Sequence, residues 1–296
     1  LPWLIGLLTV PRLFEVYTSV PVATLALTFA VSLGWGIGAI TFGMGVDYVG
    51  IALGFAIIMG LTTALGSLIP LFMHPEKAFK PAGLLIIAGV ALMMIGIAIG
   101  ARAGQLKEKA LAAVAGPATG SGKSITKGLL ICVVAGVCGS WMNLAFVFGA
   151  PIQEQAIKFG ASPTYARNAV WCLSLLGGFI VNIAYCVRLI VRGRTWHLFR
   201  AERTQLNWIY TAAMGVMWMG SLAIYGICTA KLGDLGPAMG FAIFLGMAII
   251  TGNAWGIVTG EWKGTGAKPL RLMAVSVIIL LAGMGVIGWS NTLAAK

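Results

Sequence analysis

Residues 50–73 read GIALGFAIIMGLTTALGSLIPLFM and contain no charged side chain in 24 positions. A helix needs about 20 predominantly apolar residues to cross a lipid bilayer, so this stretch predicts a membrane-spanning helix. Residues 236–259 read GPAMGFAIFLGMAIITGNAWGIVT, which has the same length, no charge and the same run GFAI. Two such stretches in one chain predict a membrane protein built from a duplicated unit.

The duplication extends to both sides of the shared GFAI run. At an offset of 183 residues, Trp35, Phe42, Gly43 and Gly50 are matched by Trp218, Tyr225, Gly226 and Gly233. At an offset of 186 residues, Gly54-Phe55-Ala56-Ile57, Gly60 and Gly66 are matched by Gly240-Phe241-Ala242-Ile243, Gly246 and Gly252. Fixed offsets over this length indicate an internal repeat, which is typical of secondary transporters.

The composition excludes a water-soluble protein. Of the 296 residues, 59% are hydrophobic and 9% are charged, whereas soluble domains carry about 25% charged residues. A soluble fold of this length cannot hide so much apolar surface from water. The net charge of +12 would suggest a nucleic-acid partner in a soluble protein, but here we assign the basic residues to membrane-flanking loops and expect no nucleic-acid partner.

The hydrophobic runs predict eight complete spans and one partial span. Proline, His-Pro and Lys-Gly segments separate them, as expected of turns between helices. The partial span covers residues 1–10, and the complete spans cover residues 21–45, 50–73, 82–101, 127–150, 165–190, 207–230, 236–260 and 271–291.

The span count predicts how the two repeats are arranged. The second repeat has five spans, and an odd number requires the two halves to face opposite sides of the bilayer. We therefore expect an all-α polytopic protein with two inverted five-helix repeats, a ten-helix transporter whose first repeat lacks about one and a half helices here. The predicted divisions are 1–101 for the remainder of the first repeat, 102–126 for a cytoplasmic linker and 127–296 for the second repeat.

Lys and Arg residues are distributed unequally between the loops on the two sides of the predicted spans. Thirteen fall on the side of the loops at 102–127 and 188–203, and seven fall on the other side. Cytoplasmic loops carry the excess of Lys and Arg in membrane proteins. The two named loops are therefore predicted to be cytoplasmic, and the C-terminus to be periplasmic.

No nucleotide, metal or catalytic site is expected. Residues 119–124, TGSGKS, resemble the end of a phosphate-binding loop, but residue 117 is Pro where the motif needs Gly and no strand precedes it. The five cysteines lie in apolar runs without metal-ligand spacing. Because no cluster of His, Ser or Asp suggests catalysis, we predict no enzymatic activity and no cofactor apart from a coupling proton.

Amides and aromatic rings inside the spans are the candidate substrate-binding groups. Asn143, Asn182 and Asn253 lie deepest, and an amide in hydrocarbon is costly unless it is paired. Aromatic rings beside amides suit a sugar, because its CH groups stack on a ring while its hydroxyls meet polar groups. The candidate substrate-binding residues are Trp35, Asn143, Asn182, Trp218 and Tyr225. The alternatives are helix-to-helix hydrogen bonds for the amides and lipid-facing positions for the rings.

A carboxylate is the expected carrier of the coupling proton. No Asp or Glu lies near the centre of a predicted span, and all eight lie near span ends or in loops. Glu154 follows Pro151, which ends a span, and is the preferred candidate for proton coupling; Asp47 is the second. The alternative for each is a solvated loop carboxylate.

Several runs resemble one known family. They include Arg102-Ala103-Gly104-Gln105-Leu106-Lys107-Glu108, which is the most distinctive, and Glu261-Trp262 near the end. The others are Trp35-Gly36-Ile37-Gly38, the stretch from Tyr48 to Gly54, and Gly177-Gly178-Phe179-Ile180-Val181-Asn182 followed by Cys186 and Arg188-Leu189. These runs resemble the L-rhamnose-proton symporter family of the drug/metabolite transporter superfamily, in order along nearly the whole chain.

The resemblance implies a ten-helix symporter of the bacterial inner membrane that imports a deoxysugar, L-rhamnose, together with a proton. Its expected partners are the sugar and the lipid bilayer. Three alternatives stay open at this point: another metabolite or nucleotide-sugar carrier of the same superfamily, a passive pore, and a membrane-embedded enzyme. A nucleotide-sugar carrier needs basic residues near its cavity, and none is expected within the spans.

Overall fold

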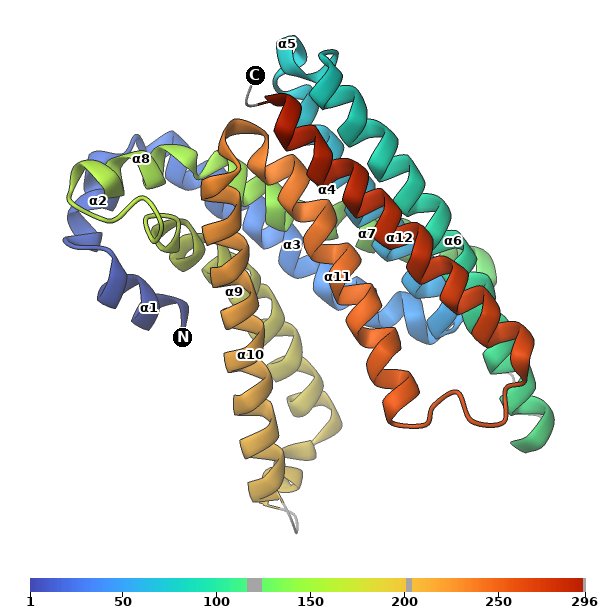
Figure 1. Cartoon of the computed structure of the whole chain (residues 1–296). Coiled ribbons are helices and arrows are strands. Elements are labelled where there is room, and N and C mark those ends of the chain that lie inside the picture. Colours follow the sequence, from blue (N-terminus) through green and yellow to red (C-terminus); the bar gives the residue numbers. More distant parts are fainter. Residues whose placement is uncertain (116–123, 201–203, 295–296) are drawn as a thin grey trace. The chain divides into compact units, whose positions relative to one another are not determined.

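The computed structural model describes residues 1–115, 124–200 and 204–294. In these residues, every regular element is a helix (Figure 1). The elements are α1 (Pro2–Thr9), α2 (Leu13–Ser19), α3 (Val22–Val49), α4 (Ile51–Phe72), α5 (Pro75–Ala78), α6 (Pro81–Ala115), α7 (Ile125–Phe148), α8 (Ala150–Lys158), α9 (Asn168–Gly193), the 3₁₀ helix η1 (Thr195–Arg200), α10 (Thr204–Lys231), the 3₁₀ helix η2 (Gly233–Leu235), α11 (Gly236–Val258) and α12 (Ala267–Ala294).

Within the described residues, 8 helices are long and apolar enough to cross a membrane. They are α3, α4, α6, α7 with α8, α9, α10, α11 and α12, so the predicted set of eight complete spans is confirmed. The partial span predicted at residues 1–10 corresponds to α1, which has 8 residues. The chain is a multi-pass membrane protein.

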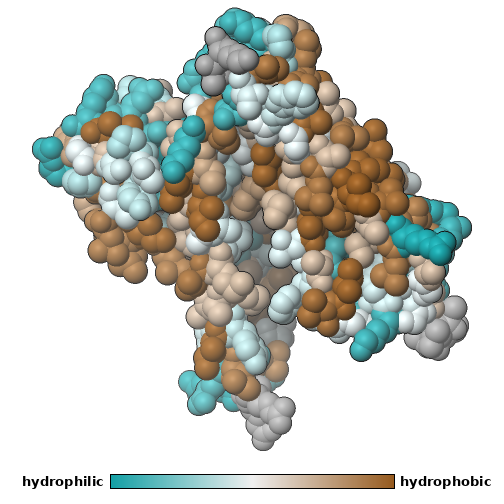
Figure 2. All heavy atoms as spheres, viewed as in Figure 1, coloured by the Kyte–Doolittle hydropathy of each residue, from teal (hydrophilic) through white to brown (hydrophobic). Residues whose placement is uncertain are grey.

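The outer surface of the long helices is apolar, as lipid requires. Exposed large side chains include Ile95 on α6 and Ile278 and Trp289 on α12. Figure 2 shows apolar side chains gathered over this face of the molecule. Surface of this kind is unfavourable in water and favourable against lipid tails.

The chain divides into two compact units, and each unit draws on both halves of the sequence. Unit 1 consists of Leu1–Ile37 and Leu144–Gly233, and unit 2 consists of Gly38–Asn143 and Asp234–Lys296. The predicted repeats describe sequence equivalence and are a different division of the chain. The predicted linker at 102–126 is helical as far as Ala115, because α6 continues to that residue. Residues 116–123, which hold most of the TGSGKS run, lie outside the described residues.

In unit 2, α6 and α12 pack together in opposite directions. Gly89 on α6 meets Ile287 on α12, a Cβ added at Gly96 would lie 3.0 Å from Leu280, and one added at Gly100 would lie 2.7 Å from the Ser276 hydroxyl. The contacts move backward along α12 as they move forward along α6, so the two helices are antiparallel (Figure 1). Glycine allows this close approach of two membrane helices because it has no side chain.

Helix boundaries recur at the offsets of the sequence repeat. The bounds of α3 and α10 agree to within one residue at an offset of 183, and those of α4 and α11 do so at 186. The first residues of α6 and α12 also agree at 186. Gly50 and Gly233, which are equivalent in the repeat, both adopt positive φ, at 89° and 67°. L side chains rarely adopt this conformation, so both breaks between helices need glycine.

In unit 1, α9 is the helix against which the N-terminal segment packs. The Tyr17 hydroxyl donates a hydrogen bond to the Ala169 carbonyl at 2.7 Å, and the Asn168 amide donates to the Thr9 hydroxyl at 3.0 Å. Burial is the main cause that raises the pKa of Tyr17 above its usual value. Since Tyr17 stays neutral, it can hold the short helix α2 against α9 as a hydrogen-bond donor.

Candidate functional site

Unit 2 contains a cavity of about 490 Å³ between three of its helices. Its wall is formed by the first turns of α4, the C-terminal half of α6 and the C-terminal half of α11, with three residues from the α11–α12 connection and from α12. Small-molecule sites have volumes of about 300–1,000 Å³, an apolar wall and a few polar groups. The cavity has this character, because most of its lining is aliphatic or glycine and its polar side chains are few.

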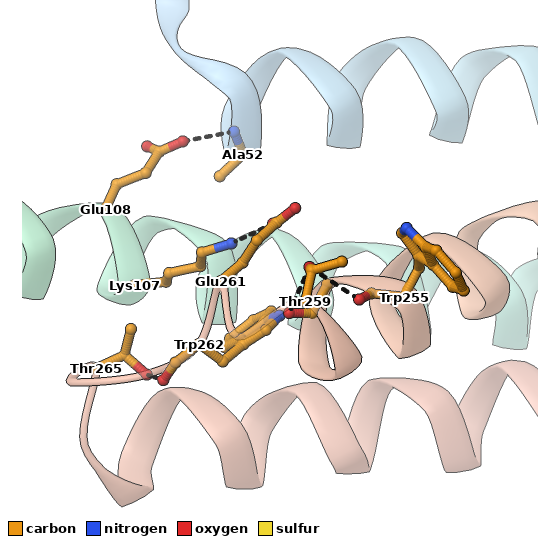
Figure 3. A network of polar contacts seen from close by, with 9 residues as sticks. Ala52, Lys107, Glu108, Trp255, Thr259, Glu261, Trp262 and Thr265 are labelled. Atoms are coloured by element: carbon orange, nitrogen blue, oxygen red, sulfur yellow. Dashed lines mark hydrogen bonds and ion pairs between the residues drawn. The ribbon is translucent and has the colours of Figure 1, made fainter. Parts of the chain in front are cut away.

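The principal polar contact of the cavity joins Lys107 and Glu261. The Lys107 ammonium lies 2.9 Å from a Glu261 carboxylate oxygen (Figure 3). It also lies 4.9 Å from the centre of the Trp262 ring, which adds a cation–π contact. The Lys107 side chain is 19% exposed and the Glu261 side chain is 59% exposed. The lysine is therefore the partner that depends on the pair, because it is the one largely removed from water.

Glu108, the neighbour of Lys107 on α6, reaches the start of α4. Its carboxylate accepts a hydrogen bond from the Ala52 backbone N–H at 3.0 Å (Figure 3). The first N–H groups of a helix have no partner within the helix and carry its positive dipole end. Gly50, at the N-cap of α4, has no side chain to satisfy them. Glu108 thus supplies from another helix the cap that α4 lacks.

The connection between α11 and α12 holds Glu261 and Trp262 in place. Gly260, Gly264 and Gly266 have positive φ, which produces a compact turn. The Thr265 hydroxyl donates a hydrogen bond to the Trp262 carbonyl at 2.8 Å, and the Trp262 side chain is buried. Figure 3 shows the Trp262 ring beside the Lys107 and Glu261 pair. The tryptophan therefore forms a fixed aromatic wall of the cavity.

Asn253 adds an amide to the cavity wall. Its Nδ2 donates to the Ile249 carbonyl of its own helix at 2.9 Å. Its Oδ1 has no hydrogen-bond partner among the described residues. An aromatic ring, a hydrogen-bond acceptor and an ion pair around an apolar space can together bind a sugar, whose faces are apolar and whose edge carries hydroxyls.

None of these residues was assigned to a site from the sequence. Glu108 and Glu261 were expected near span ends or in loops, and no basic residue was expected within a span. Lys107 was assigned to the predicted linker, but α6 continues through it and places it in the cavity wall. The helical period of α6 could have found them, because Gly100, Gly104, Lys107 and Leu111 recur at spacings of three or four residues. Glu261 could not have been found this way, since its partner is 154 residues distant.

Three of the five predicted substrate-binding residues come together in unit 1. The rings of Trp35 and Trp218, equivalent in the repeat, stack with centroids 5.9 Å apart and an interplanar angle of 6°. The Asn182 amide donates to the Gly178 carbonyl at 2.8 Å and to the Gly36 carbonyl at 3.4 Å. These bonds use both amide N–H groups, so Asn182 can offer a ligand only its oxygen. The substrate role of the three residues stays a prediction.

The predicted residue Asn143 belongs to unit 2 and is fully buried. Its amide donates to the Gly66 carbonyl at 2.7 Å and to the Pro237 carbonyl at 3.1 Å. Both N–H groups join helices, which is the alternative that the sequence left open. Gly66 belongs to α4, and Pro237 lies at the start of α11.

The fifth predicted residue, Tyr225, lies in an aromatic cluster of unit 1. Its ring centre is 5.3 Å from that of Phe146 and 6.1 Å from that of Trp171. The Phe146 and Trp171 rings stack at 4.6 Å. Trp171 and Tyr225 are almost completely buried, at 0% and 3% exposed. We call Phe146, Arg167, Trp171 and Tyr225 the arginine cluster.

Arg167 is the cation of the arginine cluster, and the sequence did not single it out. It precedes α9, and its guanidinium carbon lies 4.7 Å from the centre of the Phe146 ring. No described carboxylate lies within ion-pair distance of it. Burial lowers the pKa of Arg167, although its charge persists because an arginine titrates far above neutral pH. The buried Nε of Arg167 and the buried Nε1 of Trp171 have no hydrogen-bond partner in the described structure.

The two predicted proton-coupling carboxylates lie outside the cavity wall. Glu154 is exposed on the short helix α8 of unit 1, and Asp47 is exposed near the end of α3 in unit 2. Neither residue lines the cavity. Their coupling role stays a prediction.

The sequence model of the L-rhamnose-proton symport protein family matches residues 1–292. The chain belongs to this family. It is 27% identical over 298 aligned residues to the L-rhamnose-proton symporter of Mannheimia succiniciproducens, and 26% identical over 296 to those of Yersinia pestis and Yersinia pseudotuberculosis. Each match covers 97% of this chain and 85% of the relative. No solved structure matches it.

Family membership confirms the resemblance recognised in the sequence. The family consists of transporters, so the prediction that the protein is a membrane transporter and not an enzyme is also confirmed. The two runs that carried the resemblance most strongly, at 102–108 and 261–262, meet at the cavity of unit 2 through Lys107, Glu108, Glu261 and Trp262.

Proposed function

We propose that this protein imports L-rhamnose across the bacterial inner membrane by proton symport. The observation that carries the proposal is the cavity of unit 2, in a chain whose curated relatives are named L-rhamnose-proton symporters. The cavity offers the Trp262 ring to an apolar sugar face and the Asn253 oxygen to a hydroxyl. The methyl group of a 6-deoxysugar suits the aliphatic part of the wall.

Two carboxylates of this cavity are candidates for carrying the proton, in addition to the predicted Glu154 and Asp47. Glu261 is held by the Lys107 ammonium, and Glu108 is held by the start of α4. Protonation of Glu261 would remove the charge that Lys107 needs, and protonation of Glu108 would weaken the cap of α4. Either event changes the free energy of the contacts between helices that line the cavity, which is the requirement for coupling a proton to a conformational change.

The predicted substrate residues of unit 1 are part of the proposal. The stacked Trp35 and Trp218 provide an aromatic surface beside the oxygen of Asn182, and Tyr225 provides a phenol within the arginine cluster. Asn143 takes a positioning role, because its donors join α4 and α11. The sugar would contact these groups at different stages of its passage.

We infer an inverted-repeat architecture with ten helices in the complete unit. Support comes from α6 and α12, which start at equivalent positions of the repeat and run antiparallel in unit 2. Equivalent helices that run in opposite directions are the signature of repeats with opposite membrane orientation. The distribution of Lys and Arg supports a periplasmic C-terminus. Transport would follow from one half rocking against the other.

The test is uptake of labelled L-rhamnose by cells that express the protein, with and without an uncoupler that collapses the proton gradient. Saturable uptake that stops with the uncoupler supports the proposal. Uptake that persists with the uncoupler and does not saturate would instead indicate a pore. Absence of uptake above that of empty cells removes L-rhamnose as the substrate and favours another metabolite.

Trp262→Phe and Trp255→Phe provide matched variants for this assay. Trp262 lines the cavity. Trp255 lies near the end of α11, does not line the cavity and has a 67% exposed side chain. If the cavity binds the sugar, Trp262→Phe should raise the KM for uptake and Trp255→Phe should leave it unchanged.

A further inference from the structure

Unit 1 contains two buried N–H donors that the structure leaves without acceptors. They are the Nε of Arg167 and the Nε1 of Trp171. A buried donor without a partner costs about 1–3 kcal/mol, so folded proteins rarely keep one without a reason. Two of them in one cluster indicate that an acceptor is supplied from outside the chain.

The positions of these donors place them on one side of α9. Arg167 and Trp171 are four residues apart at the start of the helix, and residues at this spacing lie one above the other on the same face. The Phe146 ring contacts both, with the Arg167 guanidinium carbon 4.7 Å from its centre and the Trp171 ring centre at 4.6 Å. A Cβ added at Gly226 on α10 would lie 3.2 Å from the Trp171 Nε1 and 3.8 Å from the Arg167 Cβ. The absence of a side chain at Gly226 thus lets the α10 backbone approach Trp171 closely.

The chemistry of the cluster defines what it can bind. A guanidinium and an indole N–H are donors only, so their ligand must present oxygen acceptors. The aromatic rings of Phe146, Trp171 and Tyr225 pack against one another beside these donors, with ring centres 4.6–6.1 Å apart. A neutral monosaccharide combines both requirements, since it carries adjacent oxygens at its edge and CH groups on its faces.

We propose that Arg167 and Trp171 bind the transported sugar by donating hydrogen bonds to two of its oxygen atoms. This inference rests on the proposed function, because it concerns the same substrate. It adds two substrate-contacting residues that neither the sequence motifs nor the family resemblance identified. Arg167 needs no carboxylate in the empty protein, because the Phe146 ring faces its charge and the sugar completes its hydrogen bonds.

The experiment measures sugar-induced thermal stabilisation of the purified full chain in detergent. The panel contains L-rhamnose, L-mannose, L-fucose and D-glucose, each titrated against the wild type and the variants. Trp171→Phe removes one N–H and keeps an aromatic ring, and Arg167→Lys keeps the charge but removes the Nε donor. Trp208→Phe and Arg188→Lys are the matched controls, since both residues are exposed in unit 1.

The expected result is a loss of affinity for the sugar in both cluster variants. Trp171→Phe should raise the Kd about fivefold and Arg167→Lys about tenfold or more, because the hydrogen bond donated by Arg167 is assisted by charge. The two controls should bind as the wild type does. A merely structural role would lower the Tm of the sugar-free protein and leave the Kd unchanged in the variant that still folds; that result overturns the inference.

Sugar binding by the wild type tests the proposed function, and the difference between the wild type and the cluster variants tests this inference. If L-rhamnose binds the wild type and both cluster variants equally, the inference is overturned and the proposed function stands. If another sugar of the panel binds and L-rhamnose does not, L-rhamnose is removed as the substrate. The inference is then tested by measuring the Kd of the two cluster variants for the sugar that does bind. If no sugar stabilises the wild type, both proposals are overturned.

Discussion

Two largely buried cations of this protein differ in their partners: one is paired with a carboxylate of the chain and the other is not. Lys107 in unit 2 is held by a carboxylate of its own chain, at 2.9 Å from Glu261. Arg167 in unit 1 has a phenylalanine ring at 4.7 Å and no described carboxylate within ion-pair distance. A cation paired within the chain stabilises the structure and can respond to protonation of its partner. A cation with unused donors remains available for a ligand, and this difference separates a coupling role from a binding role.

The largest expected effect comes from removing the ring that supports Arg167. Phe146→Ala should lower the free energy of unfolding by about 3 kcal/mol, because a buried aromatic side chain is lost together with its stacking on Trp171. The Tm of the purified protein measures this change. Phe179→Ala is the control, since Phe179 is 59% exposed in the same unit and its loss should cost little. Equal effects of the two changes would contradict the role assigned to the arginine cluster.

A second change gives Arg167 an internal partner and so makes it resemble Lys107. Gly226→Asp places a carboxylate beside the Trp171 Nε1 and the Arg167 side chain. The new carboxylate should occupy the donors and reduce L-rhamnose uptake by about tenfold or more, since charge-assisted hydrogen bonds are the stronger ones.

Gly226→Ala is the control for the added bulk at this position. The added methyl group would lie 3.2 Å from the Trp171 Nε1, a tight contact without a charge. If the alanine variant loses as much uptake as the aspartate variant, steric crowding explains the loss. That result would contradict the claim that the new carboxylate acts by occupying the donors of Arg167 and Trp171.

The third change makes Lys107 resemble Arg167. Glu261→Gln leaves a lysine that is 19% exposed without its counter-charge, and should cost about 1 kcal/mol of unfolding free energy. Lys107→Met should cost less, because the remaining Glu261 is 59% exposed and stays hydrated. Thermal unfolding of both variants and of the double variant measures the asymmetry. A larger loss in Lys107→Met would show that the lysine is not the dependent partner.

The smallest effect is expected at the cap of α4. Glu108→Gln keeps an oxygen acceptor for the Ala52 N–H and loses only the charge beside the helix N-terminus, so it should cost about 0.5 kcal/mol. Glu108→Ala should cost about 1 kcal/mol, because the N–H then has no acceptor from α6. The Tm values of the two variants check this order, and equal values would mean that the hydrogen bond contributes nothing.

The sequence predicted the fold better than it predicted the site. Hydropathy and repeat spacing are local or periodic signals, and they identified the eight spans and the repeat offset of 186, at which the first residues of α6 and α12 recur. The sequence paired Trp35 with Trp218 because they are equivalent in the repeat, and in the structure their rings stack. The ion pair of Lys107 with Glu261 depends on packing between helices remote in sequence, and hydropathy does not encode it.

Arg167 shows why a buried cation near a helix end is hard to recognise from the sequence. A basic residue near a span end is usually solvated, and hydropathy cannot distinguish it from one covered by neighbouring rings. Its burial follows from Phe146 at the end of α7 and Tyr225 in the C-terminal part of α10, which approach the start of α9 only in the folded unit. Asn143 is the converse case, because its amide donates to carbonyls of two other helices, while its predicted substrate role stays a prediction.

Proton movement in response to the sugar tests the central claim most directly. The purified protein is reconstituted into liposomes without an imposed gradient, L-rhamnose is added outside in a weakly buffered medium, and the external pH is recorded. The account predicts a rise in external pH that saturates with L-rhamnose concentration and disappears when an uncoupler is present. Entry of labelled L-rhamnose without any change in pH would contradict proton symport.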